Sequence, residues 1–98
     1  AAAGDIPSDT RCSITNASGK DAYPISLFTW LIIYKEQNYS NRTKEQALAT
    51  VDLLKHMLDP KVQSMTSKVH YAPLPEKAVK LSLENLKTVT YTGQPLLK

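Results

Sequence analysis

The sequence has little cysteine and little glycine, and each shortage excludes a type of site. Cys12 is the only cysteine among 98 residues, so neither an intrachain disulfide nor a zinc site built from several thiolates can form. The three glycines, Gly4, Gly19 and Gly93, lie far apart, and neither G-x-x-x-x-G-K-[ST] nor G-x-G-x-x-G occurs. The chain therefore cannot assemble a glycine-rich loop around the phosphates of a nucleotide.

Long hydrophobic runs and export signals are also missing from the sequence. The longest apolar run, residues 28–34, is far shorter than the roughly 20 residues that a membrane-spanning helix needs. The first five residues have neither the basic region nor the apolar region of a signal peptide. If the protein is exported, we expect a signal peptide or a lipid-anchor cysteine to lie upstream of this chain.

The composition is that of an ordinary globular protein, and the length leaves room for one small core. Hydrophobic residues make up 42% and charged residues 21% of the sequence, which fits a soluble globular class. The net charge is +3, but the lysines and arginines are scattered and few aromatic residues lie among them. We therefore predict no nucleic-acid partner.

One segment has the pattern of a buried strand. Residues 25–35 are almost unbrokenly apolar and rich in aromatic and β-branched side chains, which predicts a strand buried on both faces. Such a strand belongs in the middle of an α/β sheet, with neighbours on both backbone edges and helices over both faces. Residues 11–15 predict a short strand that ends in a turn at 16–19, so this chain offers few neighbouring strands.

Residues 43–58 predict an amphipathic helix with a marked start. Thr43 and Gln46 match the capping box, in which each side chain satisfies a free backbone amide of the other residue. The apolar residues recur at three- and four-residue spacings and form one stripe: Ala47, Leu48, Val51, Leu54, Met57 and Leu58. Asp59 and Pro60 end this helix and start a shorter one over residues 61–69.

The rest of the chain is predicted from its prolines and glycines. Residues 71–75 must be extended because each proline disfavours helix in the residue before it, and the last helix begins at Pro75. Its apolar stripe consists of Val79, Leu83 and Leu86, with Ala78 beside it. Residues 1–3 read as the end of a helix closed by Gly4, and residues 88–98 as an irregular surface tail.

No set of residues has the spacing of a catalytic or metal site. His56 and His70 have no second histidine, cysteine or carboxylate at ligand spacing. Cys12 has no activating context for its thiol, and the carboxylates of Asp52 and Asp59 show no sign of a shared pocket. We predict no catalytic residue, no metal and no cofactor, and therefore no enzyme.

Four unusual strings carry a family resemblance. They are residues 19–26 (GKDAYPIS), 28–37 (FTWLIIYKEQ), 71–76 (YAPLPE) and 91–97 (YTGQPLL). In this order and at this spacing they resemble the C-terminal part of the phosphate-binding proteins of the PstS family. The members of that family are the solute-binding receptors of ABC-type phosphate importers.

The resemblance implies the α/β, class II periplasmic-binding-protein fold, with two lobes and phosphate held in the cleft between them. This chain resembles only the final third, so a central buried strand with flanking helices would be incomplete on its own. Residues 1–22 would end the second lobe, 23–26 would cross the hinge, and 27–98 would form the C-terminal part of the first lobe. Tyr23, Pro24 and Ile25 are the predicted hinge residues, with the bend near Pro24.

The phosphate ligands of the family lie in earlier segments, so the phosphate-binding residues of this chain stay unknown. Ser26 and Thr29 are candidate cleft-lining residues because of their place along the hinge strand. The partners implied are inorganic phosphate, bound together with the N-terminal part, the permease subunits of the ABC transporter, and the remaining receptor chain. The location implied is the periplasm or, with a membrane anchor, the outer cell surface.

Two other functions stay open. The chain could belong to a receptor for another oxyanion, such as sulfate or molybdate, although the string at 71–76 favours phosphate. It could also be an interaction module without a ligand, which uses exposed helices to dock a membrane permease. The second alternative predicts that the chain folds stably alone.

Overall fold

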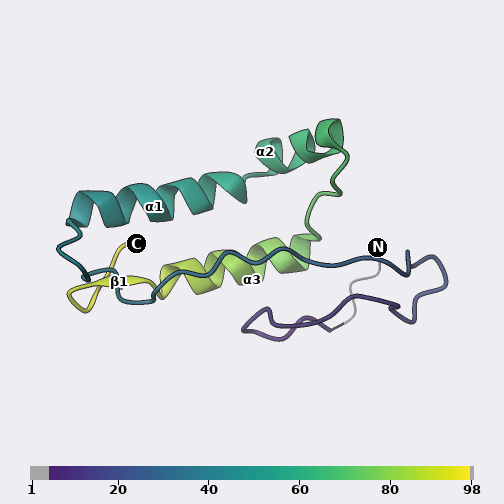
Figure 1. The fold of residues 1–98 in the computed structure, drawn as a ribbon, viewed down its shortest axis with the longest axis horizontal. Coiled ribbons are helices and arrows are strands. Elements are labelled where there is room, and N and C mark those ends of the chain that lie inside the picture. The colour runs from purple at the N-terminus through teal and green to yellow at the C-terminus, as the bar shows by residue number, and fades with distance from the viewer. Residues whose placement is uncertain (1–4, 98) are drawn as a thin grey trace.

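A computed structural model describes residues 5–97 as a small unit of helices and one hairpin (Figure 1). The helix end predicted at residues 1–3 and Gly4 lies outside the described residues. In chain order the elements are α1 (Lys44–Met57), α2 (Pro60–Met65), the 3-10 helix η1 (Thr66–Val69), α3 (Glu76–Lys87), β1 (Thr90–Tyr91) and β2 (Gln94–Pro95).

The two longer helices, α1 and α3, run in opposite directions and contact each other (Figure 1). α2 and η1 continue beyond the end of α1, and the chain then turns back into α3. The hairpin lies at the opposite end of the unit, near the start of α1. None of the helices among residues 5–97 is long and apolar enough to cross a membrane.

The predicted start of α1 is confirmed in detail. The Thr43 hydroxyl accepts the Gln46 amide at 3.3 Å, and the Gln46 side chain accepts the Thr43 amide at 3.0 Å. This reciprocal pair satisfies two of the amides that a helix start leaves without partners. Ala47 and Val51, one turn apart on the predicted stripe, are completely buried.

The helices after α1 also begin where their sequence signals lie. The Asp59 carboxylate accepts the Lys61 amide at 2.8 Å, and Pro60 occupies the first turn of α2. The predicted helix over 61–69 is thus confirmed, with its second half in the tighter 3-10 form. α3 starts directly after Pro75, and its stripe faces inward, with Ala78 and Leu86 buried.

The prediction of an irregular tail at 88–98 is wrong. β1 and β2 form an antiparallel hairpin in which Thr90 faces Pro95 and Tyr91 faces Gln94. Its turn residues, Thr92 and Gly93, have φ values of 51° and 76°, the signs of the two-residue turn that matches strand twist. Each strand is only two residues long, which is too short for an alternating pattern in the sequence to predict it.

The prediction of a regular strand at residues 25–35 is also wrong. The segment makes one parallel bridge at its end: Thr90 donates to the Lys35 carbonyl and accepts the Gln37 amide, both at 2.8 Å. The described part of the chain offers no further strand beside it, and a strand exists only through its neighbours. Several of its large side chains are exposed instead of buried: Ile25, Leu27, Trp30, Leu31, Ile32 and Tyr34.

Residues 11–15 form no strand either, because their polar groups form an ion pair and hydrogen bonds with nearby residues instead. Arg11 pairs with Asp9 at 2.8 Å, and the Thr15 hydroxyl donates to the Ser26 carbonyl at 3.1 Å. The adjoining Asn16 amide donates to the Pro24 carbonyl at 2.8 Å. The segment therefore belongs to a closed loop.

The core lies where α1, the hairpin and the end of the apolar segment meet. Ala47 and Val51 of α1 pack with Val89 and Leu96, and four partly buried side chains surround them: Ile33, Leu48, Tyr91 and Leu97. The described residues thus form a small mixed unit of helices and one hairpin. The class II binding-protein fold stays a prediction.

Candidate functional site

The predicted hinge residues lie at the end of a loop that closes on itself. Asn16 donates its amide to Pro24, and the Ser26 hydroxyl donates to the Tyr23 carbonyl at 3.0 Å. The chain turns at Pro24 and Ile25, and the side chains of Tyr23 and Ile25 are exposed. The turn directly precedes the exposed apolar segment, but its role as a hinge stays a prediction.

The two candidate cleft residues are not brought together at a shared site. Ser26 is half-buried, and its hydroxyl is engaged with the closed loop. Thr29 is exposed three residues later. Neither residue lines the hollow described next, so their placement beside a phosphate cleft stays a prediction.

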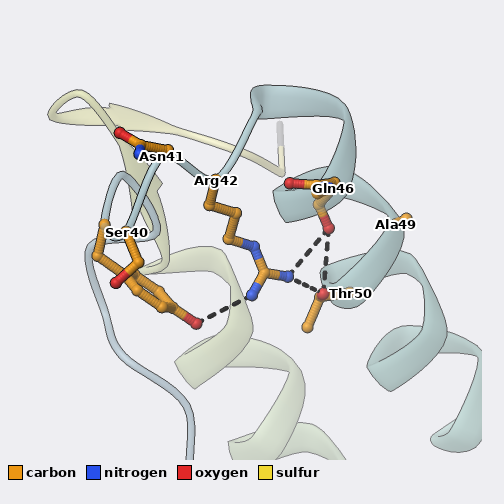
Figure 2. A pocket seen from close by; sticks show the side chains of 7 residues that line it. Ser40, Asn41, Arg42, Gln46, Ala49 and Thr50 are labelled. Atoms are coloured by element: carbon orange, nitrogen blue, oxygen red, sulfur yellow. Dashed lines mark hydrogen bonds between the residues drawn. The ribbon is translucent and has the colours of Figure 1, made fainter.

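A hollow of about 590 Å³ opens between the loop at residues 39–42 and the first turns of α1 (Figure 2). The loop turns sharply, with Ser40 and Asn41 at φ values of 49° and 59°. The seven residues that line the hollow are mostly polar: Tyr39, Ser40, Asn41, Arg42, Gln46, Ala49 and Thr50.

The half-buried guanidinium of Arg42 spans this hollow (Figure 2). It donates to the Tyr39 hydroxyl at 2.9 Å, to the Gln46 carbonyl at 3.0 Å and to the Thr50 hydroxyl. Its central carbon also lies 5.6 Å from the centre of the Tyr39 ring, within the range of a cation–π contact. The side chain thus ties the loop to the first two turns of α1.

The hairpin holds the same loop from the other side. The Tyr91 hydroxyl donates to the Arg42 carbonyl at 2.9 Å, and the Arg42 amide donates to the Tyr39 carbonyl, also at 2.9 Å. The Tyr39 ring meets the Tyr34 ring edge to face, with centroids 4.9 Å apart. The walls of the hollow are therefore held by contacts from three parts of the chain.

This hollow lacks the donors that a desolvated phosphate requires. Such an ion is held by many converging hydrogen bonds, commonly with amides at a helix start. Three of the five guanidinium donors of Arg42 already bind protein oxygens, and its Nε is buried without a partner. Since Thr43 caps the start of α1, the hollow is better described as a structural junction than as a phosphate site.

A second polar cluster surrounds the carboxylate of Glu36. The carboxylate accepts the amides of Asn38, Thr92 and Gly93 and the hydroxyl of Thr90, at 2.8–3.0 Å. The amide of Asn38, the hydroxyl of Thr90 and the amide of Gly93 together lower the pKa of Glu36 to about 2. The ionised carboxylate fixes the hairpin turn to the end of the apolar segment.

The remaining titratable candidates lie apart from one another. His56 is exposed on α1, and His70 ends η1 with a left-handed φ of 63°. Cys12 is a half-buried free thiol, and Asp59 serves as the helix cap of α2. Over residues 5–97 no three side chains of histidine, cysteine, aspartate or glutamate are grouped to hold a metal ion.

Sequence reasoning missed the two residues that organise these clusters, Arg42 and Glu36. The spacing of four from Gln46 to Thr50 is a usable signal, because these two residues share one face of α1, and Arg42 directly precedes the cap of that helix. Glu36 has no comparable signal, since its hairpin partners lie 54 to 57 positions away.

Within residues 5–97 the geometry therefore contains two structural junctions, at Arg42 and at Glu36, and no ligand site that identifies an activity. Comparison with models of known protein families, with curated proteins and with solved structures finds no match for this chain.

Proposed function

We propose that this chain is the C-terminal part of a phosphate-binding receptor of an ABC-type phosphate importer. It binds inorganic phosphate only together with the remaining receptor chain. The observation that carries the proposal is the exposure of six of the eight residues at 27–34, a segment with the composition of a buried strand. Ile32 is 93% exposed and Leu27 and Tyr34 are each 70% exposed.

An exposed apolar segment of this size is a reason to expect a partner. Soluble proteins rarely leave large contiguous apolar patches uncovered, and those they leave mark interaction sites. In the resemblance to the phosphate receptors, this segment follows the hinge and completes the first lobe. The partner that covers it is then the part of the receptor that supplies the phosphate ligands.

The polar clusters agree with a chain that does not bind phosphate alone. The donors of Arg42 are largely engaged within the fold, and those of the hairpin turn hold Glu36. On the family resemblance, the receptor works in the periplasm or, membrane-anchored, at the outer cell surface, and delivers phosphate to the permease subunits.

The test is phosphate titration calorimetry on the chain alone and on the complete receptor that contains it. We expect no heat of phosphate binding from the chain alone and a one-to-one isotherm from the complete receptor. Sulfate and molybdate, titrated into the same material, serve as matched oxyanions. Preference of the complete receptor for either of them over phosphate would contradict the proposed ligand.

The interaction module is the second candidate, and one observation favours it. The helices carry their own exposed apolar side chains, namely Leu53, Met57, Met65 and Val69. Leu53 and Met57 lie one turn apart on α1 and offer a helical face that a permease subunit could cover. A chain that is monomeric, cooperatively folded and bound to a permease without any other receptor chain would support this candidate instead.

A further inference from the structure

We infer that the turn of the hairpin is a carboxylate-binding site that the chain's own Glu36 keeps filled. The ligand of this site is the carboxylate group of a second molecule, which binds when the Glu36 side chain is displaced. The inference goes beyond the proposed function and does not depend on it, because every group of the site lies within this chain.

Four hydrogen-bond donors converge on the two carboxylate oxygens of Glu36, and together they are called the cradle here. Oε1 accepts the amides of Asn38 and Thr92, both at 2.9 Å. Oε2 accepts the Thr90 hydroxyl at 2.8 Å and the Gly93 amide at 3.0 Å. Backbone amides that converge from a turn form a concavity for anions. Two donors on each of two oxygens match the shape of a carboxylate group.

The cradle stabilises a negative charge without a cation. Its hydrogen bonds, first that of the Asn38 amide, lower the pKa of Glu36 to about 2, and no lysine or arginine contributes to this shift. Glu36 also forms no ion pair with any of residues 5–97. The donors alone therefore favour the charged form, as several amides on one carboxylate are known to do. A second carboxylate that reaches the same donors should be stabilised in the same way.

The cradle is held in place by contacts that do not involve the Glu36 side chain. Thr92 and Gly93 keep their left-handed φ values of 51° and 76° because they form the two-residue turn between β1 and β2. Val89 and Leu96 flank the hairpin, are buried in the core, and are joined by a backbone hydrogen bond of 3.0 Å. These contacts remain when Glu36 is displaced, so the donors of the turn stay preorganised for a ligand.

The cradle is accessible from solvent. Glu36, Thr92 and Gly93 are all exposed. Apart from the chain neighbours of Gly93, no atom lies within 4 Å of the point where a side chain would begin at this residue. A small carboxylate can therefore reach the donors once the Glu36 side chain rotates away, and no covering segment has to move.

Glu36 acts as a tethered ligand that closes the site. The parallel bridge, in which Thr90 bonds to Lys35 and Gln37 at 2.8 Å each, holds the Glu36 backbone beside β1. A ligand on a short tether has a high effective concentration, so a free carboxylate competes poorly with it. The contact is therefore autoinhibitory, and the site opens when Glu36 is removed or drawn away from the hairpin.

The first experiment is titration of Glu36→Ala with acetate, followed by NMR at the backbone amides of Asn38, Thr92 and Gly93. We expect saturable shifts of these amides, whereas the wild type should need at least about 10-fold more acetate for any change. Sodium chloride at equal ionic strength controls for screening and should give no saturable shift. Shifts that do not saturate, or that chloride reproduces, would overturn the inference.

A second measurement covers the case in which Glu36→Ala does not fold in buffer. Acetate that binds only the folded chain stabilises it by mass action. Acetate should therefore raise the melting temperature of Glu36→Ala by several degrees, or refold this variant, as followed by circular dichroism. Glu84→Ala loses an exposed glutamate of α3 and is the matched control. Equal effects of acetate on the two variants would overturn the inference.

Removal of one donor tests whether acetate binds in the cradle. Thr90→Val, introduced into the Glu36→Ala chain, removes the hydroxyl and should weaken acetate binding by at least about 10-fold, because a hydrogen bond to a charged group is lost. Thr88→Val in the same chain is the matched control, since the Thr88 hydroxyl donates to the Asn85 carbonyl outside the cradle. Equal acetate affinity of the two double variants would contradict binding in the cradle.

Discussion

Glu36 Oε1 accepts the backbone amide of Thr92 at 2.9 Å, although 56 positions separate the two residues. The other carboxylate oxygen accepts the Gly93 amide at 3.0 Å and the Thr90 hydroxyl at 2.8 Å. One exposed side chain therefore fastens the hairpin turn to the end of the apolar segment. The position of that segment relative to the core depends on this contact and on the bridge beside it.

Glu36→Gln should weaken the fold, because an amide side chain has one accepting oxygen where the carboxylate has two. We expect the melting temperature, measured by circular dichroism, to fall by several degrees. Glu84→Gln changes an exposed glutamate of α3 and is the matched control. An equal melting temperature for Glu36→Gln and the wild type would show that the contact contributes nothing.

The same carboxylate predicts a pH dependence with a definite sign. Hydrogen bonds, first from the Asn38 amide and then from the Thr90 hydroxyl, lower the pKa of Glu36 from 4.5 to about 2. The ionised form therefore stabilises the fold fully above pH 4.5, and this stabilisation is lost as the pH falls toward 2 and below. The check is urea denaturation at a series of pH values from about pH 6 down to about pH 2, the range over which this stabilisation is lost.

The pH experiment needs Glu36→Gln as its reference, because other carboxylates titrate in the same range. Hydrogen bonds from Arg11 lower the pKa of Asp9, and a hydrogen bond from Lys80 lowers that of Glu76. The difference in stability between wild type and variant should shrink as the pH falls. A difference that is constant with pH would contradict the role of the charge.

Arg42→Lys should destabilise the chain by about 1–2 kcal/mol, since one ammonium group cannot reach all three acceptors of the guanidinium. The measurement is the free energy of unfolding from urea denaturation. Arg11→Lys is the control: Arg11 forms an exposed ion pair with Asp9, so its loss should cost less than about 0.5 kcal/mol. Equal effects at the two positions would argue against the junction at Arg42.

Thr43→Ala should remove the cap of α1 and cost about 1 kcal/mol of stability. A lower helix content near the midpoint of thermal unfolding, followed by circular dichroism, should accompany the loss. Thr29→Ala, an exposed threonine outside the helices, is the matched control and should leave both quantities unchanged. If Thr43→Ala and Thr29→Ala showed the same melting curve, the stability of α1 would not depend on its cap.

Val51→Ala and Ile32→Ala should differ in their effect on the stability of the chain alone but not on that of the complete receptor. Val51 is completely buried, so its truncation should cost the isolated chain about 2 kcal/mol. Ile32 is 93% exposed, so its truncation should change the stability of the isolated chain by less than about 0.5 kcal/mol. In the complete receptor, Ile32→Ala should become destabilising by an amount comparable to Val51→Ala, as measured by urea denaturation.

The helices could be predicted closely because their signals are local. The capping box at Thr43, the proline at the start of α2 and the spacing of the apolar stripe act within one or two turns. The structure places each of these helices within two residues of its predicted start. The contacts that start these helices join residues only two or three positions apart.

The hairpin and the two polar clusters could not be predicted because their partners are distant in the chain. Thr92 and Gly93 meet Glu36, and Tyr91 meets Arg42, across 49 to 57 positions. No periodicity in the sequence encodes such a pairing. The exposure of most side chains at residues 27–34 could not be predicted either. Composition indicates that a segment prefers burial, but it does not indicate whether other parts of the same chain can bury it.

The amino-acid sequence by itself determined the helix starts, the apolar stripe of α1 and the apolar character of residues 25–35, since each depends on neighbouring residues. Only the tertiary structure decided that Glu36 binds the hairpin turn, that Arg42 is held at a junction, and that Ile32 faces solvent. The physical reason is that burial and long-range hydrogen bonds depend on which other segments are present to provide a surface or a partner.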